Sequence, residues 1–167
     1  KKIEAGAQFV QSQYCFDVPM FREYMKKVRD LGLHEKCYIL VGVGPMASAK
    51  TAKWIRSNVP GIHIPDSVIK RLEGAEDQKK EGKQLCIDII NEVKEIEGVS
   101  GIHVMAYRQE EYVAEMVHDS GVLKGRKPWK REPNPVDQLV AERIEMARDG
   151  HEQDQQKLAG QAAQQPH

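Results

Sequence analysis

The pattern that most constrains the fold of this chain is the repeated alternation of short apolar runs with longer amphipathic segments. The clearest apolar run covers residues 37–43, which are nearly continuous Cys-Tyr-Ile-Leu-Val-Gly-Val. Such a run is expected of a parallel strand that is buried on both faces. Apolar residues then recur at helical spacing over 47–58, where Ser48 is a candidate helix cap. A strand followed by a helix is the repeating unit of α/β proteins.

Similar units precede and follow this one. Residues 7–16 are rich in β-forming side chains and predict a buried strand. Pro19 suits the first turn of the next helix, and Gly32 supplies its end. Residues 61–65 are short for a strand, so their assignment stays open. The remaining expected elements are helices over 66–72, 77–96 and 110–118 and a strand over 99–107.

Strands that alternate with helices imply a parallel sheet, either open and doubly wound or closed into a barrel. No Gly-x-Gly-x-x-Gly loop follows the first strand, and Pro45 stands where a dinucleotide-binding loop would need a free N–H. The open sheet is therefore disfavoured. Four such units are half of a barrel, and residues 1–6 resemble the end of a helix. We therefore expect an α/β fold, the C-terminal half of a (β/α)8 TIM barrel.

The composition excludes several classes of function. Lys and Arg number 25, as do Asp and Glu, so that the formal net charge is +0, which argues against a nucleic-acid partner. No apolar run is long enough to span a membrane, and the opening lacks the apolar core of a secretory signal, so we expect a cytoplasmic protein. The cysteines and histidines lack disulfide-framework and zinc-site spacing, so we expect no metal.

Several short motifs resemble one known family. The opening from Lys1 to Asp17 has the form K-K-x-E-A-G-A-x-F-x-x-[ST]-Q-x-x-F-D, with Ser12 in place of Thr. The turn 41–46, the pair 64–65 and the Gly-Ile-His at 101–103 follow in order. Across residues 1–123 these motifs are similar to those of the methylenetetrahydrofolate reductases.

The extent of the resemblance and the composition of the remaining residues together predict a division of the chain into two parts. Residues 1–123 would be strands five to eight of the reductase barrel with their helices, and residues 124–167 a linker, a tail helix and a disordered end. The tail helix is expected over 137–148, from its apolar spacing, and would dock on the barrel or on a sister subunit of a homo-oligomer.

The resemblance also implies a reaction. The family interconverts 5,10-methylenetetrahydrofolate and 5-methyltetrahydrofolate, a step of one-carbon metabolism and methionine biosynthesis, by hydride transfer through FAD. In this family a reduced nicotinamide, NADH or NADPH, usually supplies the hydride. The family's general-acid glutamate and its folate-supporting aspartate lie in the first half of the barrel, so no catalytic residue is assigned in this chain.

Four positions are implied to contact the folate and two the flavin. Gln13 matches the family glutamine that bonds the pterin edge, and an amide can both donate and accept there. A second pterin-contacting glutamine falls on Thr51, and a substrate-packing aromatic falls on Ile55, so that Trp54 or Tyr107 would have to supply the aromatic face. Lys2, with Lys1 as a second candidate, matches residues that reach the FAD phosphates.

One departure from the family adds a charge. The family's Tyr-Thr-Leu-Asn is Met-Ala-Tyr-Arg at 105–108, and Arg108 could bind a carboxylate or phosphate or be an ordinary surface residue. Two alternatives to a reductase remain open. One is a non-reductase barrel subunit that binds a pterin or methyl donor in a methyl-transfer complex, and the other is an interaction scaffold.

Overall fold

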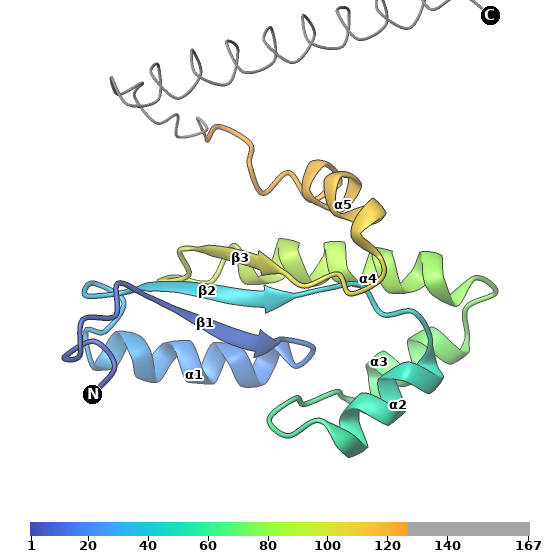
Figure 1. Cartoon of the computed structure of the whole chain (residues 1–167), viewed down its shortest axis with the longest axis horizontal. Coiled ribbons are helices and arrows are strands. Elements are labelled where there is room, and N and C mark those ends of the chain that lie inside the picture. Colours follow the sequence, from blue (N-terminus) through green and yellow to red (C-terminus); the bar gives the residue numbers. More distant parts are fainter. Residues whose placement is uncertain (127–167) are drawn as a thin grey trace, which may run out of the picture. The chain divides into compact units, whose positions relative to one another are not determined.

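Three parallel strands and the helices that connect them make up the part of the chain that the computed structural model describes, residues 1–126 (Figure 1). In chain order the elements are β1 (Phe9–Tyr14), α1 (Val18–Asp30), β2 (Tyr38–Val43), α2 (Ala49–Asn58), α3 (Asp66–Glu73), α4 (Gln78–Val93), β3 (Gly101–Val104), the 3-10 turn η1 (Glu110–Tyr112) and α5 (Val113–Asp119). The linker, tail helix and chain end expected beyond residue 126 lie outside the described residues. The expected alternation of strands and helices is confirmed in this coarse form.

Local side-chain bonds explain where the helices begin. The Asp17 carboxylate accepts the Met20 N–H at 2.9 Å and caps α1. The expected cap at Ser48 is confirmed, since its hydroxyl accepts the Thr51 N–H at 3.1 Å. Asp77 caps α4. Each cap satisfies an N–H that the first helical turn would otherwise leave without a partner.

The segment between α2 and α3 does not form a strand. Pro60 and Pro65 flank it and remove N–H groups that a ladder would need. Ile62 and Ile64 are nonetheless buried, so the segment is held by apolar packing and not by sheet hydrogen bonds. The fourth strand of the expected half-barrel is therefore not confirmed among the described residues.

The sheet has the order β1-β2-β3, and both pairings are parallel. Phe9 is opposite Tyr38 at one end, and Gly42 is opposite His103 near the other. Because all three strands point the same way, their carboxyl ends meet at one edge. The loops that follow the strands therefore lie near one another.

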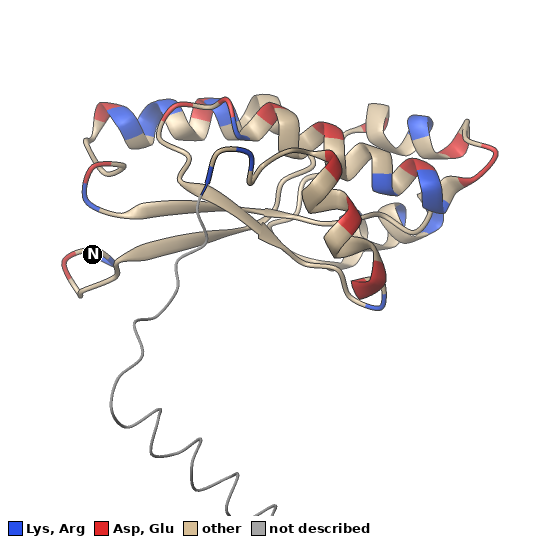
Figure 2. Ribbon diagram, turned by 90° about the horizontal axis from the view of Figure 1, so that it is seen from above, with Lys and Arg blue, Asp and Glu red and all other residues tan. Residues whose placement is uncertain are grey.

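The long helices α1 and α4 lie on one side of this sheet, as Figure 2 shows. Val41 on that face is fully buried, as are Met25 of α1 and Ile90 of α4. Side chains alternate along a strand, so the opposite face carries the register pair Phe9 and Tyr38, which are 58% and 67% exposed. The strands contain no charged residue. The described part of the chain thus has one covered and one uncovered, uncharged sheet face.

Two glycines allow the loop between β2 and α2 to lie unusually close to its neighbours. A Cβ on Gly82 of α4 would overlap the carbonyl oxygen of Met46, and one on Gly44 would overlap the carbonyl oxygen of Met105 beyond β3. The loop is therefore held between a helix and a strand end by backbone contacts that leave no room for a side chain.

Within residues 1–126, no helix is both long and apolar enough to cross a bilayer.

We expect Gly82→Ala to destabilise the protein by about 1–3 kcal/mol, because backbone on both sides must move to admit the methyl group. Gly74→Ala is the matched control, since Gly74 has φ −78° and an added Cβ would meet only Lys70 and Arg71 carbonyl oxygens, the nearest at 3.4 Å. Urea unfolding of the full-length variants measures both. Equal midpoints would mean that the close approach at Gly82 does not constrain the fold.

Candidate functional site

Two cavities open near the carboxyl ends of the strands, and Tyr14 lines both. The first, here called the β1–α1 cavity, has a volume of about 390 Å³ and lies between β1 and α1. The second, the strand-end pocket, has a volume of about 400 Å³ and is walled by the 45–47 loop, α2, the start of α4 and residues 107–109. Both volumes are in the range of small-molecule sites.

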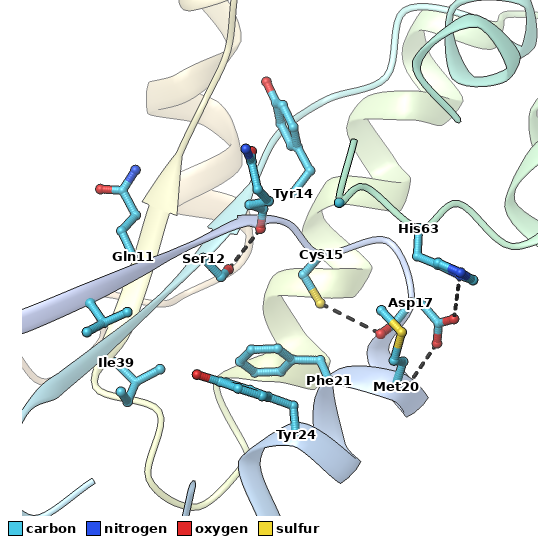
Figure 3. A pocket seen from close by; sticks show the side chains of 13 residues that line it. Gln11, Ser12, Tyr14, Cys15, Asp17, Met20, Phe21, Tyr24, Ile39 and His63 are labelled. Carbon is cyan, nitrogen blue, oxygen red and sulfur yellow. Dashed lines mark hydrogen bonds and ion pairs between the residues drawn. The ribbon is translucent and has the colours of Figure 1, made fainter. Parts of the chain in front are cut away.

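The β1–α1 cavity is largely apolar. Phe21 and Tyr24 of α1 form its floor, with ring centroids 5.9 Å apart, and Ile39 closes it from β2 (Figure 3). At its far end the His63 Nδ1 lies 3.6 Å from an Asp17 carboxylate oxygen. The cavity therefore offers a stacking surface with a few polar groups at its mouth.

Gln13 lines this cavity from an irregular point in β1. The pairing of β1 with β2 shifts register between Gln11 and Tyr14. There the Ser12 hydroxyl accepts the Gly42 N–H at 2.9 Å and donates to the Gln13 carbonyl oxygen at 2.8 Å. Such an irregularity changes the direction of the side chains that follow it. Ser12 therefore holds the backbone from which the exposed Gln13 side chain extends, a role that the sequence did not reveal.

Tyr14 joins the outer strands at their carboxyl ends. Its hydroxyl donates to the Met105 carbonyl oxygen at 2.8 Å, and its ring stacks on Phe16 with centroids 5.6 Å apart. Burial, and secondarily the Cys86 thiol nearby, raises the pKa of Tyr14 above its ordinary value. The hydroxyl therefore remains a donor at neutral pH. Tyr14 was not a sequence candidate, although it shapes both cavities.

Three of the sequence candidates come together in the strand-end pocket. Thr51 and Ile55 line it from α2, and Tyr107 lines it from the loop after β3. The Thr51 hydroxyl lies 3.0 Å from the Ser48 hydroxyl. Trp54, the other aromatic considered, is 61% exposed and does not line this pocket. Gln13 lines the neighbouring cavity, which shares only Tyr14 with this pocket.

The same pocket contains polar residues that sequence reasoning missed or left undecided. Gln109 is only 8% exposed, and its Oε1 has no hydrogen-bond partner in the described structure. Arg108 beside it has φ 58°, a left-handed conformation uncommon for residues other than glycine. Lys79 enters from α4, and contact with Tyr112 raises its pKa, so that it stays a cation. No sequence signal marked Gln109 or Lys79, because their proximity is created only by folding.

The flavin-side candidates lie at the opposite end of β1. Lys2 lines an open groove beside Gly6 and Ala7, before the strand begins. Lys1 is exposed and does not line this groove. The groove continues along the first half of β1 as far as Gln11, two residues before Gln13. Gln11 also lines the β1–α1 cavity, so the groove and that cavity are neighbours along β1.

Among residues 1–126, no group of three or more His, Cys, Asp or Glu side chains converges in a way that could hold a metal ion. Cys15, Cys37 and Cys86 are free and buried. The polar groups that line the two cavities are amides, hydroxyls and cations, together with the Asp17 carboxylate and the His63 ring, and such groups suit recognition of a polar organic ligand.

A parallel α/β unit with aromatic and hydrogen-bonding side chains gathered at its strand ends has the arrangement of an α/β domain that binds small molecules. The family model "Methylenetetrahydrofolate reductase" matches residues 1–121. The chain therefore belongs to the methylenetetrahydrofolate reductase family, and the expectation from its motifs is confirmed.

Curated relatives bear the same name. The chain is 25% identical over 144 residues to "Probable methylenetetrahydrofolate reductase (NADPH)" of Caenorhabditis elegans, covering 81% of this chain and 21% of the relative. It is 26% identical over 129 residues to "5,10-methylenetetrahydrofolate reductase" of Salmonella typhimurium, covering 75% and 42%. It is 27% identical over 139 residues to "Methylenetetrahydrofolate reductase 2" of Schizosaccharomyces pombe, covering 78% and 21%. The matched region thus spans from about a fifth to about two fifths of each relative's length.

We expect the thiols of Cys15 and Cys86 to resist alkylation in the folded protein at pH 8. Burial raises the pKa of each to about 12, helped at Cys15 by the charges of Asp17 and Glu92. In the unfolded chain both thiols ionise near their ordinary pKa of 9.0, whereas in the folded protein they stay protonated to higher pH. The free energy of unfolding should therefore fall as pH rises from about 9 toward 12. Iodoacetamide labelling followed by peptide mass spectrometry, with a urea-unfolded control, tests the first point. Rapid labelling of either cysteine in the folded sample would contradict it.

Proposed function

We propose that this chain forms the second half of a flavin-dependent (β/α)8 barrel that interconverts 5,10-methylenetetrahydrofolate and 5-methyltetrahydrofolate by hydride transfer. The observation that carries the proposal is the continuous family match over residues 1–121, which includes all the described strands and the loops after them. We assign residues 1–123 to the barrel and residues 124–167 to the tail.

The uncovered sheet face supports the barrel. A parallel sheet normally has both faces covered, whereas Phe9 and Tyr38 lie exposed on the face opposite α1 and α4. In a closed barrel that face becomes the filled interior and the helices form the outer ring. The face is uncharged and carries the rings of Phe9 and Tyr38 beside the amide of Gln11, which fits a filled barrel interior better than it fits contact with water.

Gln13 would bind and orient the pterin. Its side chain is exposed at the mouth of the β1–α1 cavity, near the carboxyl end of β1. Substrate groups bind at this end of the strands in barrel enzymes. An amide can accept from one N–H and donate to a neighbouring oxygen of a pterin edge. The Ser12 hydroxyl, bonded to the Gln13 carbonyl oxygen, would hold the backbone of Gln13 in place.

The strand-end pocket would receive the part of the folate beyond the pterin. Ile55 offers an apolar wall and Tyr107 an exposed ring, which can pack on an aromatic group of the ligand. Thr51 offers a hydroxyl where the family has an amide. We propose that Tyr107 and Ile55 together replace the family aromatic at this position.

FAD is the cofactor that the family implies, and the described residues fit part of it. Lys2 would meet a phosphate beside Gly6, which has no side chain, and Ala7, whose side chain is a single methyl group. When bound, FAD would supply the two-electron chemistry, and the chain would supply binding and orientation. NADH or NADPH would be the electron donor, and the name of the Caenorhabditis elegans relative specifies NADPH.

We expect the full-length protein to bind FAD and to lose the flavin's visible absorbance when 5-methyltetrahydrofolate is added without oxygen. An absorption spectrum before and after addition measures this directly. FAD that stays oxidised in the presence of bound folate would favour a non-reductase barrel that only binds a methyl donor.

A narrower test concerns Gln13. Gln13→Ala should keep FAD bound and slow the folate half-reaction by about 10- to 100-fold, because the pterin loses its bidentate partner. Gln8→Ala is the control, since Gln8 is also an exposed glutamine before the same strand but lines neither cavity. Stopped-flow flavin spectra give the rates. Equal rates of the folate half-reaction in the two variants would show that Gln13 does not bind the pterin.

A further inference from the structure

Of the described residues, only Tyr14 lines both cavities of the site. The β1–α1 cavity, which Gln13 lines, lies to one side of it, and the strand-end pocket, which Tyr107 lines, lies to the other. A ligand that occupies both cavities would therefore lie against the Tyr14 side chain. The contacts that fix this side chain also decide how the two cavities are placed relative to each other.

The Tyr14 hydroxyl connects two strands that are not neighbours in the sheet. β2 lies between β1 and β3, yet the hydroxyl donates to the Met105 carbonyl oxygen, just beyond β3, at 2.8 Å. The two residues are 91 positions apart in the sequence. Residues 105–109, here called the β3 turn, include three residues that line the strand-end pocket. Through this bond, Tyr14 ties one wall of that pocket to β1.

Gly44, in the loop after β2, leaves the space through which Tyr14 reaches the β3 turn. A Cβ at Gly44 would lie 2.5 Å from the Tyr14 Cε1 and would overlap the Met105 carbonyl oxygen. Any side chain at position 44 would thus separate the hydroxyl donor from its acceptor. The bond from β1 to the β3 turn therefore depends on a glycine at the end of the strand between them.

The Tyr14 ring is held in place as well as its hydroxyl. The ring points away from Phe21 and Tyr24 of α1, as Figure 3 shows, and stacks on Phe16 with centroids 5.6 Å apart. Phe16 is itself buried in the core. Because the ring is already fixed, little conformational freedom is lost when the hydroxyl bonds its acceptor. The side chain therefore acts as a rigid spacer between β1 and the β3 turn.

The β3 turn has few other restraints. The Met105 N–H donates to the Val43 carbonyl oxygen at 2.7 Å, which ties the start of the turn to β2. Farther along, Tyr107 is 75% exposed, and Arg108 has φ 58°, a conformation that is unfavourable for arginine. In the described part of the chain, the Tyr14 hydroxyl is the hydrogen-bond donor that connects this turn to β1. Loss of the hydroxyl should let the turn move relative to Gln13.

We propose that Tyr14 is a positioning residue, which fixes the spacing between Gln13 and the β3 turn so that one ligand can engage both cavities at once. This inference rests on the proposed function, in which the pterin meets Gln13 and the rest of the folate enters the strand-end pocket. A two-part ligand gains affinity from its second contact only when the geometry lets both parts bind together. Tyr14 thus acts on the ligand through the β3 turn and not through the reaction.

The test compares a two-part ligand with its pterin part alone. 5-Methyltetrahydrofolate has both parts, and 5,6-dimethyltetrahydropterin has only the pterin. The full-length protein with FAD is first photoreduced without oxygen, so that neither ligand can transfer a hydride to the flavin and calorimetry measures binding alone. In Tyr14→Phe the dissociation constant of the folate should rise about fivefold, the effect of one lost hydrogen bond. The dissociation constant of the pterin should not change, because Gln13 is held by Ser12.

Tyr38→Phe is the matched control, since Tyr38 is an exposed tyrosine of β2 that lines neither cavity. It should bind both ligands as the wild type does. Replacement of Tyr14 by p-aminophenylalanine returns an N–H donor to the ring and should restore the affinity for the folate. Equal losses for the folate and the pterin in Tyr14→Phe would show a purely structural role and overturn the proposal. Unchanged affinity for both ligands would also overturn it.

Hydrogen exchange gives a second readout, which needs no ligand. Tyr14→Phe should raise the deuterium uptake of the β3 turn, because the turn loses its bond to β1, and should leave the uptake of α1 unchanged. Tyr38→Phe should match the wild type in the β3 turn. Equal uptake of the turn in Tyr14→Phe and the wild type would contradict the proposal, since the turn would then be held without the hydroxyl.

Failure of the proposed function has a different signature. In that case the wild type binds neither the folate nor its pterin part, whereas hydrogen exchange still shows whether Tyr14 holds the β3 turn. If both ligands bind the wild type and Tyr14→Phe leaves the ratio of their affinities unchanged, the proposed function is retained and only the role of Tyr14 is wrong.

Discussion

The close backbone contact around the loop between β2 and α2 is the constraint on which the site depends. Gly44 lets this loop meet the Met105 carbonyl at the end of β3, and Gly82 lets it meet α4. Tyr14 then bonds the same Met105 carbonyl from β1. Three elements far apart in sequence are thus fixed against one short loop. These contacts set the spacing between the walls of the strand-end pocket, because the loop forms one of those walls.

Much of the fold follows from local sequence. The apolar run at 37–43 became β2, and the Ser48 cap began α2, because strand burial and helix capping depend on neighbouring residues. The sequence of residues 61–65 does not decide whether they form a strand. In the structure they form none, because prolines flank them. The strand at 101–104 is shorter than the apolar run that predicted it, since only those residues pair with β2. Patterns in sequence mark apolar segments well but do not mark where pairing stops.

The site was less accessible to such reasoning. Thr51, Ile55 and Tyr107 were chosen by motif position, and the fold brings them to one pocket. The roles of Ser12, Tyr14 and Gln109 depend on contacts between residues that are 30 or more positions apart in the sequence. The hydrogen bonds Gly42–Ser12 and Tyr14–Met105 are examples. No periodicity encodes such contacts. A motif can therefore nominate the residues that face a ligand, whereas the residues that support them are found only in three dimensions.

The two unpaired edges of the described sheet have a consequence for hydrogen exchange. Among the described strands, β2 is paired on both sides, whereas β1 and β3 each have one edge without a partner. Backbone amides that point away from β2 exchange with solvent unless another segment covers them. The isotope uptake of β1 and β3 relative to β2 therefore reports whether further strands complete the wall. This measurement does not depend on catalysis, so it tests the assembly of the fold separately from the reaction.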